Sequence, residues 1–326
     1  MESFIFAINA ILPIVLTVAI GYLVKRIGIL SGSVTKAINK LVFRVLLPAM
    51  LFLNVYKIEN LGDIDLGYVL FCILLTFAFF FASIPLILMI TKRRDQRGVL
   101  VQSIFRSNYA LIGIPLATSL FGEAGSIIAT LLSAFIIPIF NALAVVCLTI
   151  FGDGDKIDVK KILIGIIKNP LIQSIALGCA CLGIRALFVE FQIDFRLSDI
   201  TPIYSVLSQL AATATPIALI ALGAEFEFSA VPSLKKQIIF GTVARVVVIP
   251  AVALVIAYYM GCFGGAHFAT FVAMFATPVA VSSVPMAQEM GADSTLAGQL
   301  VVWTTILSAF TIFIISFILK SVGVFS

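Results

Sequence analysis

Apolar runs long enough to cross a bilayer as helices, about 20 residues each, occupy almost the whole chain. They lie near residues 4–24, 35–55, 66–91, 98–120, 124–151, 162–185, 202–224, 236–260, 265–290 and 294–320. Of the 326 residues, 61% are hydrophobic and only 11% are charged, unlike a soluble domain. We therefore predict an all-α polytopic membrane protein with about ten transmembrane helices and no separate soluble domain.

Composition and motifs exclude several classes of function. The net charge of +5 comes from basic residues in short loops, which suits membrane topology better than nucleic-acid binding. The N-terminal run lacks a cleavage pattern and is predicted to be the first spanning helix. The five cysteines fit neither a disulfide framework nor a zinc site. One histidine and no metal-ligand cluster leave little from which to build an enzyme, and no nucleotide-binding G-x-x-x-x-G-K-[ST] loop indicates a primary pump. We expect no cofactor and no metal.

Most basic residues lie in the loops that follow the first, third, fifth and seventh runs. These loops hold Lys25, Arg26, Lys36, Lys40, Lys92, Arg93, Arg94, Arg97, Lys156, Lys160, Lys161, Lys168, Lys235 and Lys236. The even-numbered loops hold little besides Lys57, Arg185 and Arg196. Because Lys and Arg near helix ends are retained on the cytoplasmic side, we predict that both termini lie outside.

The two halves of the chain share a faint repeat. Pro115 and Pro285 are 170 positions apart, as are Glu123 and Asp293. Further matches join Pro48 to Pro216 and Gly21 to Gly178. We predict two five-helix repeats, residues 1–152 and 162–326, joined by a short cytoplasmic linker at 153–161. An odd number of helices inverts the second copy, which is typical of secondary transporters; chance alignment of apolar sequence is the alternative.

The fourth run contains residues that interrupt a helix. In "SNYALIGIP", Asn108 stands seven residues before Pro115, with Gly113 between them. Proline removes a backbone donor and clashes with the preceding turn, whereas glycine tolerates unwinding. We therefore predict that this helix breaks near the middle of the membrane.

The ninth run matches it. In "TPVAVSSVP", Pro278 stands seven residues before Pro285, with Ser282 and Ser283 between them. Paired interruptions of this kind point to the substrate site of a transporter, because freed N–H groups attract an anion and freed carbonyls a cation. The predicted substrate-binding residues are Asn108, Tyr109, Gly113, Pro115, Pro278, Ser282, Ser283 and Pro285. Simple kinks are the alternative, since proline and glycine are common in membrane helices.

Polar residues near these breaks each have two interpretations. Gln288, Glu289 and Asn141 are candidates for binding a coupling ion, although Glu289 alternatively reaches the cytoplasmic interface. Glu123 and Asp293 stand where helices begin, so each is either a helix cap or a proton carrier.

The basic residues within the apolar runs are interpreted by depth. Arg245 lies deep in its run and is either part of a structural pair or a counter-charge for an anionic substrate. Arg44 and Arg106 lie closer to basic loops and are predicted to snorkel toward the interface. His267, at the start of the ninth run, is predicted to be interfacial rather than part of a proton relay.

The motifs "PIVLTVAIGYLVKRIGIL", "LVFRVLLPAMLF", "NYALIGIPLATSLFG", "TPIALIALGAEF" and "ATPVAVSSVPMAQEMGAD" together resemble the auxin efflux carrier family of bacterial and plant permeases. The resemblance covers nearly the whole chain. It implies a ten-helix inverted repeat like that of sodium/proton antiporters and bile-acid symporters, with proline-broken crossover helices 4 and 9. Asn108 matches the asparagine of the family's fourth helix.

The resemblance also carries functional expectations. It implies a scaffold of helices 1, 2, 6 and 7, a mobile transport domain of helices 3 to 5 and 8 to 10, and pairing into a homodimer. The plant PIN exporters have a long central loop, whereas "GDGDKIDVKK" is short here, which favours a bacterial-type permease. We expect a secondary transporter for a mono- or dicarboxylate, coupled to H⁺ or Na⁺, in a bacterial inner membrane. An anion channel and a ligand sensor are the alternatives.

Overall fold

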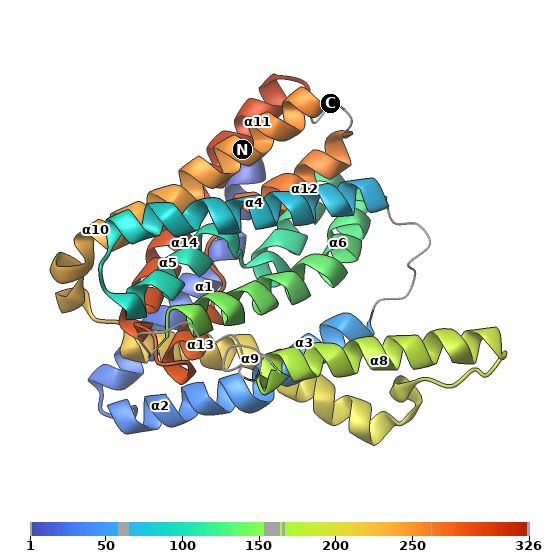
Figure 1. Cartoon of the computed structure of the whole chain (residues 1–326), viewed down its shortest axis with the longest axis horizontal. Coiled ribbons are helices and arrows are strands. Elements are labelled where there is room, and N and C mark those ends of the chain that lie inside the picture. The colour runs from blue at the N-terminus through green and yellow to red at the C-terminus, as the bar shows by residue number, and fades with distance from the viewer. Residues whose placement is uncertain (1, 58–64, 153–163, 165–166, 262, 325–326) are drawn as a thin grey trace.

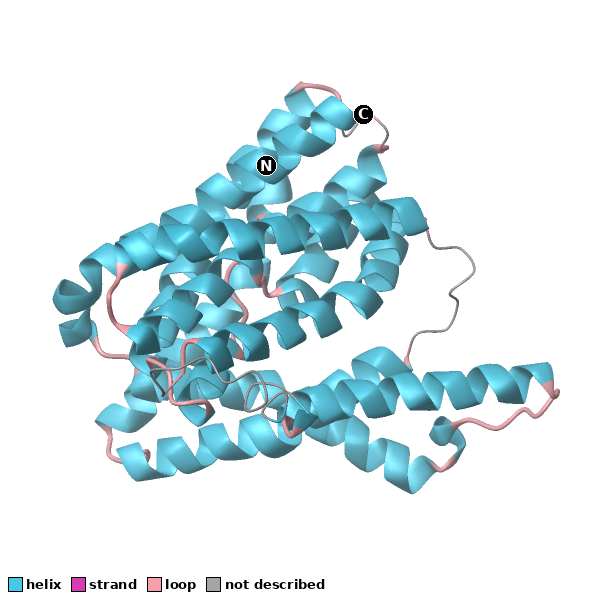
Figure 2. Ribbon diagram, viewed as in Figure 1, coloured by secondary structure: helices cyan, strands magenta, loops and turns pink. Residues whose placement is uncertain are grey.

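The computed structural model describes residues 2–57, 65–152, 164, 167–261 and 263–324, with side chains described from residue 12 onward. Helices joined by short loops make up this part of the chain (Figure 2). By length and composition, seven helical stretches among the described residues are able to cross a membrane: Gly32–Tyr56, Leu66–Ile90, Tyr109–Ile150, Pro170–Glu190, Thr201–Glu225, Phe228–Met260 and Ser294–Ser321. The predicted all-helical, polytopic membrane fold is confirmed. The predicted linker at 153–161 lies outside the described residues.

The helices of the first half follow the predicted runs. They are α1 (Glu2–Arg26), α2 (Gly32–Leu41), η1 (Val42–Leu46), α3 (Leu47–Tyr56), α4 (Leu66–Ile90), α5 (Arg94–Phe105), η2 (Tyr109–Gly113) and α6 (Ile114–Ile150). Within α6, Gly122 has φ 58° and ψ −143°, a conformation that favours glycine. This kink falls between the runs predicted at 98–120 and 124–151, so α6 contains the end of one predicted helix and all of the next.

The second half continues in the same way. Its elements are α8 (Pro170–Glu190), η3 (Leu197–Asp199), α9 (Thr201–Glu225), η4 (Phe228–Ala230), α10 (Val231–Val243), η5 (Ala244–Val248), α11 (Ile249–Met260), α12 (Gly265–Phe275), α13 (Ser283–Glu289) and α14 (Ser294–Ser321). The C-terminal helix α14 begins at a capped residue, because the Asp293 carboxylate accepts a hydrogen bond from the Leu296 amide at 2.9 Å. The capping interpretation of Asp293 is thereby confirmed.

Three short π-helical segments share one sequence cause. Segments η1, η2 and η5 end two residues before Pro48, Pro115 and Pro250, respectively. A proline within a helix lacks the N–H donor and its ring clashes with the carbonyl four residues earlier. The wider turn of a π-helix accommodates this defect. These prolines therefore widen their helices without breaking them.

Two helix pairs pack closely through glycine. At Gly21 of α1, an added Cβ would clash with the Ile220 carbonyl oxygen of α9. At Gly178 of α8, it would lie 2.9 Å from Cβ of Val55 in α3. Small residues let membrane helices approach in this way. Figure 1 shows α2, α3, α8 and α9 grouped along the lower edge of the molecule, where α9 also contacts α2 and α3.

Large apolar side chains also cover the outside of the molecule. Met89 on α4, Leu177 on α8 and Tyr259 on α11 are among those exposed by more than half of their surface. A bilayer solvates such groups, whereas polar groups must find partners inside the protein. A functional site is therefore expected among the polar side chains that are buried within the bundle.

Candidate functional site

Two helices are interrupted where they meet. Helix α5 ends at Phe105 and the helical chain resumes at Tyr109, while α12 ends at Phe275 and α13 begins at Ser283. The intervening segments, 106–108 and 276–282, pair with each other through an antiparallel β-bridge between Ser107 and Val279. We call this paired region the crossover. Both predicted interruptions are confirmed.

Backbone hydrogen bonds hold the crossover together. The Asn108 amide donates to the Pro278 carbonyl at 2.8 Å, and the Val279 amide donates to Oγ1 of Thr304 on α14 at 3.1 Å. Unwound backbone at membrane depth is tolerated only where such partners replace the helical ones. The two broken helices and α14 therefore form one connected unit.

The break in the fourth predicted helix lies earlier in the chain than Gly113 and Pro115 predicted. Gly113 and Pro115 lie in helical backbone, and the non-helical residues are Arg106 to Asn108. Gly113 instead allows close packing, because a Cβ there would lie 2.8 Å from the Ala273 carbonyl oxygen of α12. The expected unwinding around Gly113 is therefore wrong, since the π turn of η2 accommodates the proline. Pro285 likewise lies within helix α13.

Arg106 lies inside the protein, and the snorkelling prediction for it is wrong. Its side chain is only 2% exposed. Nη2 donates to Oδ1 of Asn141 at 2.7 Å and to Oγ of Ser282 at 2.6 Å. Nη1 contacts Oε1 of Gln102 at 3.3 Å and Sδ of Met286 at 2.9 Å. The unwound backbone directs the side chain toward α6 and α13, away from the basic loop.

A small cavity of about 50 Å³ lies against the crossover. Its polar lining residues are Asn54, Arg106, Ser107, Asn108, Tyr109, Asn141 and Ser282, and its apolar lining residues are Leu47, Met50, Leu51, Ala110, Ile137, Phe140 and Ala280. Of the described residues that line it, none is acidic. A cavity of this size suits a small solute rather than a large one.

Unpartnered polar atoms gather here. Oγ of Ser107, Nδ2 of Asn108, Nε2 of Gln102 and Oγ of Ser283 are buried without a hydrogen-bond partner among the described residues. A buried group in this condition costs about 1–3 kcal/mol and calls for a bound partner or a functional reason. Three of these atoms, those of Gln102, Ser107 and Asn108, lie within about one turn of the break in the fourth predicted helix.

The structure brings together only some of the predicted site residues. Asn108, Tyr109, Ser282 and the coupling-ion candidate Asn141 line the cavity. The Tyr109 hydroxyl already donates to the Ala129 carbonyl at 3.0 Å. The remaining predicted substrate-binding residues do not line the cavity; these are Gly113, Pro115, Pro278, Ser283 and Pro285.

Gln288 and Glu289 contact α2 and η1, away from the cavity lining. Nδ2 of Asn39 donates to Oε1 of Gln288 at 2.7 Å. Glu289 forms an ion pair with Nε of Arg44 at 3.3 Å, and the Arg44 side chain is 62% exposed. The prediction that Arg44 reaches the interface is consistent with this exposure. These contacts connect α13, which follows the crossover in the chain, to the second predicted helix.

Arg245 is buried and has no carboxylate partner among the described residues. Its side chain is 0% exposed. The guanidinium donates to three backbone carbonyls, those of Ile104 at 2.9 Å, Met274 at 3.0 Å and Thr277 at 2.9 Å. These carbonyls stand at the C-terminal ends of α5 and α12, where the helix dipole is negative. Arg245 therefore caps both broken helices at once.

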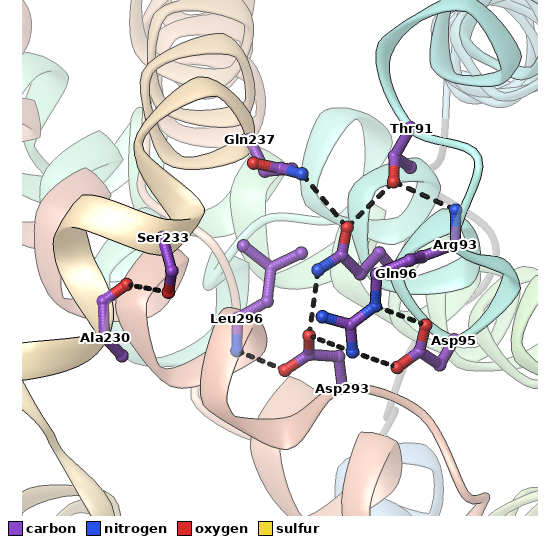
Figure 3. A network of polar contacts seen from close by, with 9 residues as sticks. All are labelled: Thr91, Arg93, Asp95, Gln96, Ala230, Ser233, Gln237, Asp293 and Leu296. Atoms are coloured by element: carbon purple, nitrogen blue, oxygen red, sulfur yellow. Dashed lines mark hydrogen bonds and ion pairs between the residues drawn. The ribbon is translucent and has the colours of Figure 1, made fainter.

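A polar network at the start of α5 and α14 surrounds Gln96 (Figure 3). Nε2 of Gln96 donates to Asp293 at 3.1 Å, and Gln237 of α10 donates to Oε1 of Gln96 at 3.1 Å. Arg93 contacts both Asp95 at 2.6 Å and Asp293 at 3.4 Å. The hydrogen bond to Asp95 raises the pKa of Arg93, so its charge is maintained. The network joins α5, α10 and α14.

A larger cavity than the one at the crossover is apolar and lies elsewhere. Its volume is about 610 Å³, and its lining comes from α4, α10, η5 and α11, with Ile104 of α5. Several of its residues, including Leu86, Ile239 and Val248, are exposed on the outer surface. This cavity is a groove that lipid chains are able to occupy, and it offers almost no polar group for recognising a substrate.

Sequence reasoning missed Arg106, Ser107 and Gln102 as residues of this site. The signal available in the sequence was spacing: Arg106 precedes Asn108 by two residues, and both residues line the cavity. Periodicity favoured a helix through this stretch, which would have directed the two side chains to different faces.

Comparison with known proteins identifies the family. A family model described as "Membrane transport protein" matches residues 6–316. An uncharacterized transporter of Methanothermobacter thermautotrophicus is 22% identical over 322 residues, which cover 94% of this chain and 96% of that protein. An uncharacterized transporter of Methanocaldococcus jannaschii is 27% identical over 258 residues, which cover 75% of this chain and 77% of that protein. The chain is thus a multi-pass membrane transporter that belongs to the Membrane transport protein family, the auxin efflux carrier family that its motifs resemble.

Proposed function

We propose that this protein is a secondary active transporter that moves a small organic anion, a mono- or dicarboxylate, by alternating access. The observation that carries the proposal is the crossover, where two interrupted helices pair beside a cavity lined by unpartnered donors. Transporters place substrate sites at such paired interruptions. The site is formed by Asn108, Tyr109, Ser282 and the backbone of the two breaks.

An anion suits this site better than a cation. The helical stretch that begins at Tyr109 has its N-terminus at the cavity, since Tyr109 and Ala110 line it. A helix N-terminus favours negative charge. Nδ2 of Asn108, a donor without a partner on a side chain that is 8% exposed, lies at the same place. The cavity thus presents donors and positive potential to a ligand.

Reciprocal packing supports the inverted repeat of residues 1–152 and 162–326. Helix α1, the first predicted helix of the first half, packs on α9, the second predicted helix of the second half. Helix α8, the first predicted helix of the second half, packs on α3, which belongs to the second predicted helix of the first half. The predicted repeat partners Gly21 and Gly178 serve these two contacts. In the proposed mechanism, α1, α2–α3, α8 and α9 form the scaffold, and the remaining helices carry the crossover between the two faces.

The contacts of α13 with α2 and η1 suggest how one face closes. Arg44 pairs with Glu289, and Asn39 binds Gln288. In the proposed division of the chain, these contacts join the scaffold to the transport domain on the side predicted to be cytoplasmic, and they must separate when that side opens. Coupling to H⁺ or Na⁺ through Gln288, Glu289 or Asn141 stays a prediction. So do the homodimer, the bacterial inner membrane and the external termini.

The proposal is tested by uptake of labelled lactate, malonate, malate and indole-3-acetate into proteoliposomes, with and without proton or sodium gradients. Saturable uptake that responds to one gradient supports a secondary transporter and names the coupling ion. Single-channel currents would instead identify a channel. An acid that raises the melting temperature of the protein but is never accumulated or exchanged would identify a sensor.

A further inference from the structure

Arg106 carries a positive charge into the centre of the proposed site, and nothing in the sequence patterns or the family comparison assigns it a role. We propose that its guanidinium binds the carboxylate of the substrate and restricts the substrate to one carboxylate on a small apolar body. This inference rests on the proposed transport function and narrows its substrate class.

The charge of Arg106 has no counter-charge within the described residues. Its four acceptors are the amide oxygens of Gln102 and Asn141, the hydroxyl of Ser282 and the thioether of Met286. All four are neutral. A buried charge is ordinarily paired with an opposite charge, because desolvation costs several kcal/mol. In the membrane, such residues mark substrate or ion pathways, proton relays or counter-charges for a ligand.

Arg245, a buried arginine with a structural role in the same protein, has a different kind of hydrogen-bond acceptor. Its three acceptors are backbone carbonyls at the ends of two helices, fixed in position and negative in potential. The acceptors of Arg106 are flexible side chains, and Asn141 and Ser282 line the cavity together with it. A carboxylate that enters the cavity can therefore replace Asn141 and Ser282 on Nη2, as Arg–carboxylate pairs are commonly bidentate.

The neighbouring unpartnered atoms need an acceptor as well. Nδ2 of Asn108 and Oγ of Ser107 are buried without partners among the described residues, and both residues line the cavity with Arg106. Nε2 of Gln102, on the residue that contacts Arg106, is also unpartnered. A carboxylate has two oxygens that accept several hydrogen bonds. One carboxylate group would thus satisfy the charge and the free donors together.

The rest of the cavity does not suit a second charge. Apart from Arg106, none of its described lining residues is basic, and its apolar lining includes Leu47, Met50, Leu51, Ile137 and Phe140. A second carboxylate would lie unpaired against these apolar side chains, which is unfavourable. The volume of about 50 Å³ also favours a short acid. Butyrate matches these properties better than succinate.

The first experiment uses the wild-type protein in detergent and measures binding by calorimetry, independently of transport. The probes are acetate, butyrate, succinate and the neutral isostere butyramide. We expect saturable binding of acetate or butyrate, with at least tenfold weaker binding of both succinate and butyramide. Equal binding of butyramide and butyrate, tighter binding of succinate, or binding of none of the acids would each overturn the inference.

The second experiment changes the arginine. We expect Arg106→Gln to weaken butyrate binding at least tenfold and Arg106→Lys to retain part of the affinity through its charge. The matched control is Arg26→Gln at the exposed end of α1, which is expected to bind as the wild type does. Butyrate binding by a folded Arg106→Gln variant with wild-type affinity would overturn the inference, even if that variant transports poorly.

Uptake into proteoliposomes separates the two levels of the proposal. Wild-type protein that binds butyrate through Arg106 but never accumulates or exchanges it contradicts the transport function and leaves the binding site in place. If the Arg106→Gln variant transports acids with the same affinity as the wild type, the transport function is supported and the role of Arg106 is refuted. If Arg106→Gln does not fold, the selectivity of the wild type among the four probes decides the inference.

Discussion

Replacing Arg245 by methionine tests whether this residue holds the two broken helices together. The substitution keeps much of the side-chain length but removes the guanidinium that binds the carbonyls of Ile104, Met274 and Thr277. The site is completely buried, so water cannot replace the lost donors. Three carbonyls at the ends of α5 and α12 are left without a partner.

The expected cost follows from these three carbonyls. A buried acceptor left unsatisfied costs about 1–3 kcal/mol, which gives about 3–9 kcal/mol for three. Measured hydrogen bonds between membrane helices average only about 0.6 kcal/mol, which sets a lower value of about 2 kcal/mol. Removal of a buried charge recovers part of the loss. We therefore expect the Arg245→Met variant to lose about 2–5 kcal/mol of stability.

The measurement is thermal unfolding in detergent, followed through the fluorescence of the single tryptophan, Trp303 on α14. Arg44→Met is the matched control, because Arg44 is exposed and its ion pair with Glu289 is worth at most about 1 kcal/mol. We expect a large decrease in melting temperature for Arg245→Met and a small one for the control. A variant that melts like the wild type would refute the capping role. If that stable variant also failed to bind acids, Arg245 would be the counter-charge of the substrate instead.

Substitutions at three further positions probe the crossover and its supports. Asn108→Ala should reduce transport at least tenfold while the protein stays folded, because it removes the free amide at the cavity; normal uptake would exclude Asn108 from the site. Gly113→Ala should lower stability by about 1–3 kcal/mol, measured by thermal unfolding, because its Cβ would lie 2.8 Å from the Ala273 carbonyl oxygen; an unchanged melting temperature would show that η2 shifts freely. Asp293→Ala should cost about 0.5–2 kcal/mol through loss of the cap on the Leu296 amide, whereas Asp293→Asn should cost less, and equal losses would indicate that charge rather than capping matters.

The helices were predictable because they depend on local composition. Apolar runs gave the helices and their order, and the prolines at positions 115 and 285 drew attention to the correct pair of interrupted helices. The position of the first break was not predictable from the prolines, because a π turn accommodates Pro115 and the unwinding occurs at Arg106 to Asn108 instead. A π turn and a break leave the same local signal, and only the partner segment at 276–282 distinguishes them.

The two buried arginines were harder to interpret for a related reason. The sequence shows that both lie within or beside apolar runs, but not which groups surround them. Depth along a helix suggested that Arg106 would snorkel, whereas the extended backbone after Phe105 directs it inward to Asn141 and Ser282. The surroundings of a side chain after a break depend on tertiary packing, which periodicity does not describe.

The positions of these two arginines relate the stability of the crossover to its function. A break in two membrane helices produces two kinds of end: carbonyl ends at α5 and α12, and an N–H end at the helical stretch from Tyr109. Arg245 occupies the carbonyl ends permanently, since its partners are backbone atoms that move with the helices. The N–H end has no corresponding acidic side chain among the described lining residues, and Arg106 adds further positive charge there. The negative potential of the carbonyl ends is thus neutralised by Arg245, whereas the positive potential at the N–H end is not neutralised by a described lining residue. An anion is therefore needed to neutralise the N–H end. In the proposed function the substrate meets this requirement, so that its binding completes the electrostatics of the transport domain before that domain moves.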